Sequence, residues 1–185
     1  KKYNKQASVT VSVGGFVPKP FTPFQWFGQN TSEELQRKIN LLKDATSRIR
    51  GVQLKWHDPK ATLIEGVLSR GDRALSALVE EVWKSGGTFQ EWSEHFDLDL
   101  WLSALERAGL TLEDLVYRHR REDEALPWDH LSAGLHKDFL WQDWRDALAD
   151  LLAREEGKQL TEARGEVLRA AQIFKFFAGE TIRNT

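Results

Sequence analysis

Apolar and polar residues alternate in two short segments of the chain. Residues 8–13 read SVTVSV and residues 52–57 read VQLKWH, so every second side chain is apolar. A period of two predicts β-strands with one apolar face each. Between them, apolar residues recur at helical spacing over 32–49, and Gly51 closes the pattern. Strand, helix and strand in this order predict a βαβ unit with parallel strand pairing.

The segment between the first strand and this helix is rich in proline and aromatic residues. Residues 16–30 contain three prolines and five aromatic side chains. Proline fixes φ and removes a backbone donor, so we expect a loop here. The helix should begin near Thr31 or Ser32, with Ser32 as its cap and Glu33 and Glu34 in its first turn.

Beyond Pro59 the apolar pattern is helical almost throughout. It predicts a helix from Pro59 to Gly71, a second one capped by Asp72 with Leu75, Leu78, Val79 and Val82 inward, and a short helix over 89–95. Asp97 should cap a further helix that stops at Gly109. Thr111 and Asp114 resemble a capping box around a brief helix to Tyr117.

The C-terminal residues predict a helical hairpin. Its first arm runs from Lys137 to about Glu156, and the second carries a heptad-like seam of apolar residues over 160–177. We therefore predict a mainly α fold with a small β element in three regions. These are a βαβ unit with its proline-rich loop over 1–58, a helical region over 59–136 and the hairpin over 137–185.

Composition narrows the classes of partner and compartment. The 185 residues are 41% hydrophobic and 29% charged, with a net charge of −2, which is typical of a globular protein. Without a basic excess we expect no nucleic-acid or anionic-membrane partner. No apolar stretch is long enough to span a bilayer and no signal-peptide pattern is visible. The absence of cysteine excludes disulfides and cysteine metal sites, and fits a cytoplasmic location.

His57 and Asp58 follow the second strand, where functional residues of α/β folds often lie. His57 could act as a general base oriented by Asp58. Alternatively, Asp58 caps the helix that starts at Pro59, and we favour this interpretation.

A metal-dependent hydrolase would draw its ligands from His57, His95, Asp129 and His130. No HExxH spacing is present. We favour helix caps and a polar network around the tryptophans, and we therefore predict no catalytic residue and no metal site.

Two basic features allow anion binding. Lys19, within the proline-rich loop, could contact an anionic ligand, although we favour a solvated lysine. Residues 118–121 read RHRR and precede the acidic residues 122–124, so we expect a solvated loop of mixed charge.

Four sequence blocks carry a resemblance to a known family. They are VTVSVGGFVPKPFTPFQW, VQLKWHDPKATLIEGVLSRGDRAL, GGTFQEWSEHFDLDLWLSAL and LPWDHLSAGLHKDFL, in this order. Residues of about 8–144 thus resemble the C-terminal region of B12-binding-domain-associated radical-SAM proteins, beginning at the last barrel strand. The resemblance implies an enzyme that cleaves S-adenosylmethionine with a 4Fe–4S cluster. The cluster motif is absent, and no cysteine can ligate iron here.

The end of the chain resembles a different family. LLAREEGKQLTEARGEVLRAAQIFKFFAGE, within residues of about 147–183, is similar to an N-terminal helical segment of NAD-dependent aldehyde dehydrogenases. In that family the segment is scaffold, so the resemblance carries over no catalytic residue and no NAD contact. The resemblance changes from one family to the other near residues 144–146. This change predicts that the chain is a fragment, or an engineered, generated or recombined chimera.

Together these features predict a non-catalytic helical scaffold or interaction module without a cofactor. We expect it to bind a protein partner or to self-associate through the strand edge or the C-terminal seam. The alternative is the substrate-recognition region of a radical-SAM enzyme, acting with a cluster-bearing portion. A further alternative is the metal-dependent hydrolase.

Overall fold

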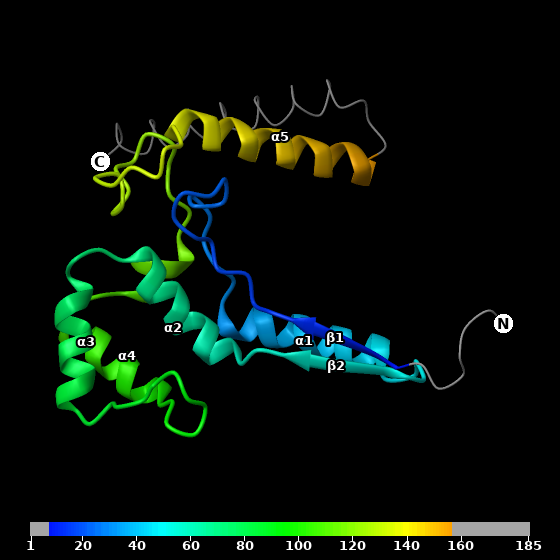
Figure 1. Ribbon diagram of the computed structural model, residues 1–185, viewed down its shortest axis with the longest axis horizontal. Coiled ribbons are helices and arrows are strands. Elements are labelled where there is room, and N and C mark those ends of the chain that lie inside the picture. The colour runs from blue at the N-terminus through cyan, green and yellow to red at the C-terminus, as the bar shows by residue number, and fades with distance from the viewer. Residues whose placement is uncertain (1–7, 157–185) are drawn as a thin grey trace, which may run out of the picture. The chain divides into compact units, whose positions relative to one another are not determined.

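The computed structural model describes residues 8–156, apart from the side chains of Ala149 and residues 152–156. The elements are β1 (Val9–Val13), α1 (Ser32–Thr46), β2 (Val52–Trp56), α2 (Pro59–Arg70), α3 (Leu75–Lys84), α4 (Leu98–Arg107), the short π-helix η1 (Glu113–Tyr117) and α5 (Lys137–Glu156). Figure 1 shows these elements along the chain. The prediction of a mainly α fold with a small β element is confirmed, and the second hairpin arm lies outside the described residues.

The chain forms two compact units. Of the described residues, the larger unit comprises 8–20 and 25–130, and the smaller comprises 21–24 and 131–156. The larger unit contains β1, β2 and α1 to α4, and the smaller contains α5. Within residues 8–156, no helix combines the length and the apolarity needed to cross a bilayer.

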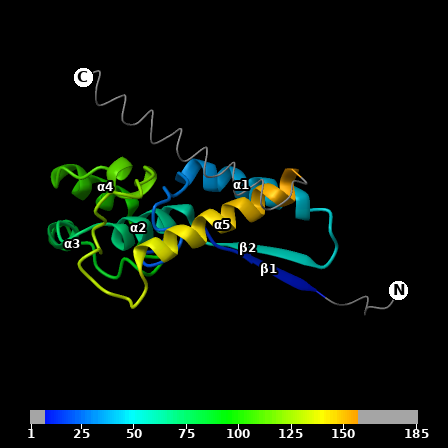
Figure 2. The same ribbon diagram turned by 90° about the horizontal axis from the view of Figure 1, so that it is seen from above.

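The two strands pair in parallel, as the βαβ pattern predicts. Val9 is opposite Val52, and the register continues to Val13 opposite Trp56. Because paired residues project to the same side of a sheet, the valines of β1 share a face with the apolar residues of β2. Helix α1 runs beside this pair in both views (Figures 1 and 2). Lys43 of α1 lies over the Trp56 ring, with Nζ 5.0 Å from its centre, so α1 lies against β2.

Side-chain caps fix where three helices begin. The Thr31 hydroxyl accepts a hydrogen bond from the Glu34 amide at 3.2 Å, and Asp58 accepts one from the Lys60 amide at 2.9 Å. Asp97 accepts hydrogen bonds from the first amides of α4. These contacts satisfy amides that have no partner inside the helix. The predicted caps of α2 and α4 are confirmed. The predicted Ser32 cap of α1 is wrong, because Thr31 is the cap and Ser32 is the first helical residue.

The core of the larger unit lies among α2, α3, α4 and η1. Figures 1 and 2 show α3 and α4 at the end of this unit remote from the strands. The cluster of buried side chains comprises Leu63, Ile64, Val67, Leu75, Leu78, Val82, Trp101, Ala104, Leu105 and Val116. The predicted inward face of α3 is wrong at Val79, which is 46% exposed.

The predicted helix over 89–95 is absent, and these residues form turns. Phe89 adopts a positive φ of 54°. The Gln90 side chain also supplies the contacts that a helix would make, since it donates to the carbonyl of His95 and accepts from the amide of Asp97. Asp72 likewise does not cap α3. It accepts from the Ala74 amide in the preceding turn, and α3 begins without a side-chain cap.

Candidate functional site

A cleft of about 240 Å³ opens where β1 and β2 end. The carboxyl ends of parallel strands meet at one edge, which is where ligands of open α/β sheets bind. The cleft lies among the turn after β1, helix α1 and the start of α2. Its lining residues are Val13, Gly14, Gly15, Phe16, Asn30, Leu35, Lys38, Ile39, Leu42, His57, Pro59 and Thr62.

Gly15 allows the turn after β1 to approach helices α1 and α2 closely. A Cβ atom on Gly15 would lie 2.6 Å from Cγ2 of Thr62 and 3.3 Å from Cδ1 of Leu35. Leu35 and Ile39 are buried and form the apolar wall of the cleft. The close approach at Gly15 therefore sets how narrow the cleft is on the side of α2.

The polar side chains of the cleft are Asn30, Lys38, His57 and Thr62. The Thr62 hydroxyl donates to the Asp58 carbonyl at 3.1 Å. The Lys38 ammonium lies 3.6 Å from the Glu34 carboxylate in an exposed pair, which contributes little stability and leaves the ammonium able to change partner. An apolar wall with a few polar groups fits a small, partly apolar molecule that carries an acceptor group.

His57 and Asp58 do not form a hydrogen-bonded pair. Asp58 accepts from the Lys60 amide as the cap of α2, and His57 lines the cleft. The helix-cap interpretation of Asp58 is confirmed. Among residues 8–156, no carboxylate forms the hydrogen bond with His57 that would orient it as a base.

The four metal-ligand candidates lie in different local environments. His57 is in the cleft, the His95 ring centre is 6.0 Å from that of Phe89, and Asp129 accepts from the Leu126 amide at 2.8 Å. His130 follows in an exposed position. Within residues 8–156, no group of three histidine, aspartate or glutamate side chains is arranged to hold a metal ion.

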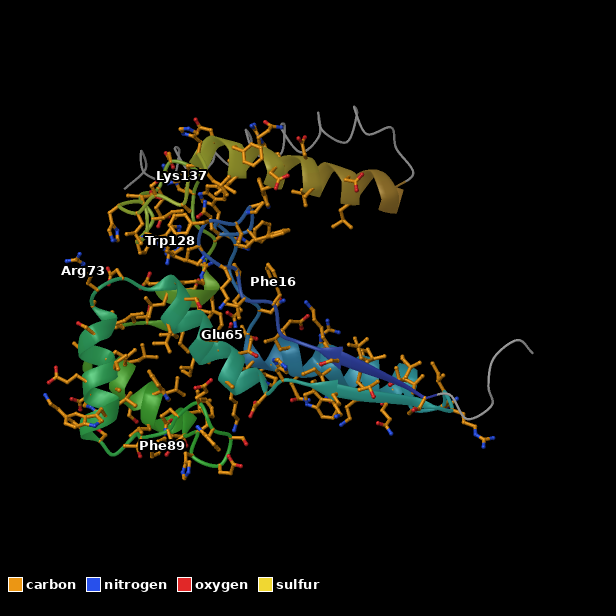
Figure 3. The ribbon with its side chains drawn as sticks, in the orientation of Figure 1. Phe16, Glu65, Arg73, Phe89, Trp128 and Lys137 are labelled. Atoms are coloured by element: carbon orange, nitrogen blue, oxygen red, sulfur yellow. The ribbon has the colours of Figure 1, made fainter. Side chains whose placement is uncertain are left out.

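The basic candidates have local partners. Lys19 donates to Glu65 and to the hydroxyl of Ser69 at 2.9 Å, which ties the proline-rich loop to α2; Figure 3 labels Glu65 on this helix. The Lys19 side chain is 44% exposed, so it stays in contact with solvent, as expected, while it pairs with α2.

In the mixed-charge loop, Arg118 pairs with Glu124 and Arg121 pairs with Asp123. Arg120 is only 7% exposed, so its prediction as a solvated residue is wrong.

Sequence reasoning did not single out Asn30 or Lys38 in the cleft, nor Arg70 at the end of α2. A lysine on the exposed side of a helix and an arginine in a last helical turn are both common without any ligand. No local pattern distinguishes them, because their neighbours come from distant parts of the chain.

Comparison with known proteins gives partial matches, two of which are to glycerol kinases. A glycerol kinase from Rhodopseudomonas palustris (strain BisA53) is 25% identical over 138 residues, which cover 68% of this chain and 26% of the relative. A glycerol kinase from Nitrobacter hamburgensis is 28% identical over 108 residues, which cover 52% of this chain and 21% of the relative. This chain thus spans about a quarter of the length of these curated relatives. No family model matches the chain, and no solved structure matches it.

Proposed function

We propose that the chain is a non-catalytic interaction module that self-associates by strand addition at the outer edge of β1. Backbone amides and carbonyls at an unpaired strand edge form a ready template for another strand. The observation that carries this proposal is the two-stranded parallel sheet. A pair of strands is marginal by itself, and parallel strands normally lie within larger sheets.

The register identifies which groups of β1 point outward. The Val9 amide donates to the Gly51 carbonyl at 2.7 Å, and the Val13 carbonyl accepts from the His57 amide at 3.1 Å. Since successive residues of a strand direct their backbone groups to opposite edges, Thr10 and Ser12 present theirs away from β2. Within residues 8–156, no further strand pairs with this edge.

Side-chain exposure also favours β1 over β2 as the edge that is used. Val9 is 58% exposed and Val11 is 38% exposed, whereas Val52 and Leu54 of β2 are partly buried. Helix α1 packs against β2 and leaves the valines of β1 less covered. A strand added beside β1 would bury this apolar surface as well as pair its backbone groups.

A second copy of the chain suits this edge. Strand β1 reads VTVSV and carries no charged side chain, so two copies can approach without like-charge repulsion. Many natural proteins protect an edge strand with lysine or proline, and β1 has neither. In a two-fold dimer β1 would pair antiparallel with its counterpart, and the same patch would serve both copies.

Thr10→Pro tests the proposal, because proline removes the outward amide of Thr10 and leaves the β1–β2 hydrogen bonds in place. We expect the wild-type chain to dimerise with increasing concentration in sedimentation velocity. Thr10→Pro should remain a monomer and keep the wild-type circular dichroism spectrum.

Val11→Pro is the matched control, since Val11 directs its amide towards β2, and we expect it to lower the thermal unfolding midpoint. A wild-type chain that is monomeric at every concentration would refute the proposal, as would a Thr10→Pro variant that dimerises as the wild type does.

A second candidate function is substrate recognition for a cluster-bearing radical-SAM portion. The cleft at the carboxyl ends of β1 and β2 favours it, because binding residues of barrels and open sheets gather at that end. The test is anaerobic mixing of the chain with a cluster-bearing portion and S-adenosylmethionine. Chain-dependent cleavage of S-adenosylmethionine supports this function, and absence of both complex and cleavage refutes it.

The proposal also includes a cytoplasmic location and a composite origin of the chain. The absence of cysteine supports a cytoplasmic location. The composite origin and both family resemblances stay predictions, and the encoding DNA would test them. The glycerol kinase matches carry no proposal, because each spans only about a quarter of the relative.

A further inference from the structure

A second cavity, of about 310 Å³, lies at the C-terminal end of α2. Helix η1 and the loop after it form the other walls. The lining residues are Arg70, Gly71, Asp72, Asp114, Leu115, Arg118, Arg120, Glu124, Ala125, Leu126 and Pro127. Three arginines thus share one cavity, and two of them are buried.

Arg70 is the more deeply buried, with no exposed surface. Its Nε donates to the carbonyl of Leu115 at 3.3 Å, and Nη1 donates at 3.3 Å to the carbonyls of Pro18 and Gln25. Its Nη2 is buried without a hydrogen-bond partner. No carboxylate of residues 8–156 forms an ion pair with Arg70, so its charge is met by carbonyl dipoles alone.

Arg120 lies beside Arg70 and is also buried with one donor lacking a partner. Its Nη2 donates to the carbonyl of Arg70 at 3.0 Å, and its guanidinium lies 5.2 Å from the ring centre of Trp128, which Figure 3 labels. Its Nε is buried without a hydrogen-bond partner, and no carboxylate of the described part of the chain forms an ion pair with it. Buried donors without acceptors are costly, and two of them occur on neighbouring guanidinium groups.

The carboxylates of the cavity are engaged elsewhere or exposed. Glu124 accepts from Nη1 and Nη2 of Arg118, and Asp114 lies 3.9 Å from Arg118. Asp72 accepts from the amide of Ala74. Asp72 and Asp114 are exposed, so water and salt screen them more than the buried arginines.

Burial, followed by repulsion from Arg120 and Arg118, lowers the pKa of Arg70 to about 10. The guanidinium therefore stays charged at neutral pH. The buried end of the cavity carries positive charge that its exposed carboxylates offset only in part.

We propose that this cavity binds the oxyanion group, phosphate or carboxylate, of a small molecule. An oxyanion offers acceptors to both unpartnered donors and balances the charge of Arg70 and Arg120. A water molecule takes up roughly 30 Å³ of liquid, so the cavity has room for an anion together with part of the molecule that bears it. This inference does not depend on strand addition at β1.

The test compares phosphate, malonate and chloride on the full-length chain at matched ionic strength. We expect phosphate or malonate, but not chloride, to raise the thermal unfolding midpoint and to give a saturable isotherm in titration calorimetry. The arm that responds identifies the anion as a phosphate or a carboxylate. Arg120→Gln should weaken this binding by roughly tenfold or more, since it removes a charged donor.

Arg121→Gln is the matched control. It removes the same charge one residue along, where the side chain is 59% exposed and pairs with Asp123. It should bind the anion as the wild type does. If Arg120→Gln fails to fold, Arg118→Gln provides the same comparison from the exposed side of the cavity. The proposal is overturned if neither anion binds the wild-type chain, or if Arg121→Gln weakens binding as much as the cavity variant.

Discussion

At the scale of single residues, Gly28 shows how closely the proline-rich loop lies on η1. A Cβ on Gly28 would stand 1.8 Å from the carbonyl oxygen of Tyr117, and the next amide, that of Gln29, donates to Val116 at 2.9 Å. Backbone atoms cannot yield as a flexible side chain can. We therefore predict that Gly28→Ala lowers the free energy of unfolding by at least about 3 kcal/mol in urea titrations.

Gly14 supplies the matched comparison within the same stretch of chain. Its added Cβ would meet nothing closer than Nδ1 of His57, at 4.0 Å. Gly14→Ala should change the free energy of unfolding by no more than about 0.5 kcal/mol. Equal losses in the two variants would show that the contact between the loop and η1 is not what makes Gly28 necessary.

Glu124 makes the stability of the larger unit depend on pH. Hydrogen bonds from Arg118 lower the pKa of this carboxyl below its ordinary value of 4.5, against the opposing effect of burial. A carboxyl with a lowered pKa in the folded state stabilises the fold above its ordinary pKa, and this stabilisation is lost as the pH falls through the lowered value.

Glu124→Gln should therefore be less stable than the wild type by about 1 kcal/mol at neutral pH. The difference should shrink once the pH falls below 4.5. Chemical unfolding at a series of pH values measures it. Asp123→Asn, whose carboxylate belongs to an exposed pair with Arg121, is the control and should show a smaller effect at every pH. A difference that is independent of pH would contradict the assignment.

At the scale of elements, the cap of α2 decides between two interpretations of Asp58. As a cap it holds the Lys60 amide at 2.9 Å, so Asp58→Ala should cost about 1 kcal/mol of stability. Asp58→Asn keeps an acceptor and should cost much less. Thermal unfolding of both variants checks this, and comparable losses would show that the charge rather than the cap matters.

The elements that the sequence predicts correctly are those fixed by neighbouring residues. Asp58 and Asp97 bond to amides within three positions, so the chain itself displays these helix starts. The helix expected over 89–95 fails for a reason that spacing does not encode. Gln90 replaces helical hydrogen bonds with side-chain bonds, one of which reaches the indole of Trp101. Trp101 belongs to α4, so this hydrogen bond forms only when α4 packs against the turn.

At the scale of the whole molecule, the two sites likewise could be predicted only where neighbouring residues determine them. The cleft could be anticipated in part, because parallel strands bring Gly14 and His57 to one edge. The arginine cavity could not. Arg70 meets Leu115 and Arg120 across 45 and 50 positions of sequence, and each arginine resembles a solvated residue in its local context. Burial of such groups depends on tertiary packing, which sequence patterns describe least well.

The division into two compact units leads to a prediction about cooperativity. Leu78 is fully buried in the core of the larger unit, so Leu78→Ala should cost about 2–5 kcal/mol. If each unit unfolds cooperatively by itself, hydrogen exchange should quicken across α2, α3 and α4 and stay unchanged in α5. Mass spectrometry of exchanged peptides separates these segments.

Val79→Ala is the control for this experiment, since Val79 is the next residue of α3 and is 46% exposed. It should leave exchange nearly unchanged in both units, because an exposed valine loses little buried area on truncation. Faster exchange in α5 alongside α2 to α4 in Leu78→Ala would mean that the units unfold as one. A response in α2, α3 and α4 without one in α5 would mean that the core of the larger unit unfolds separately from α5.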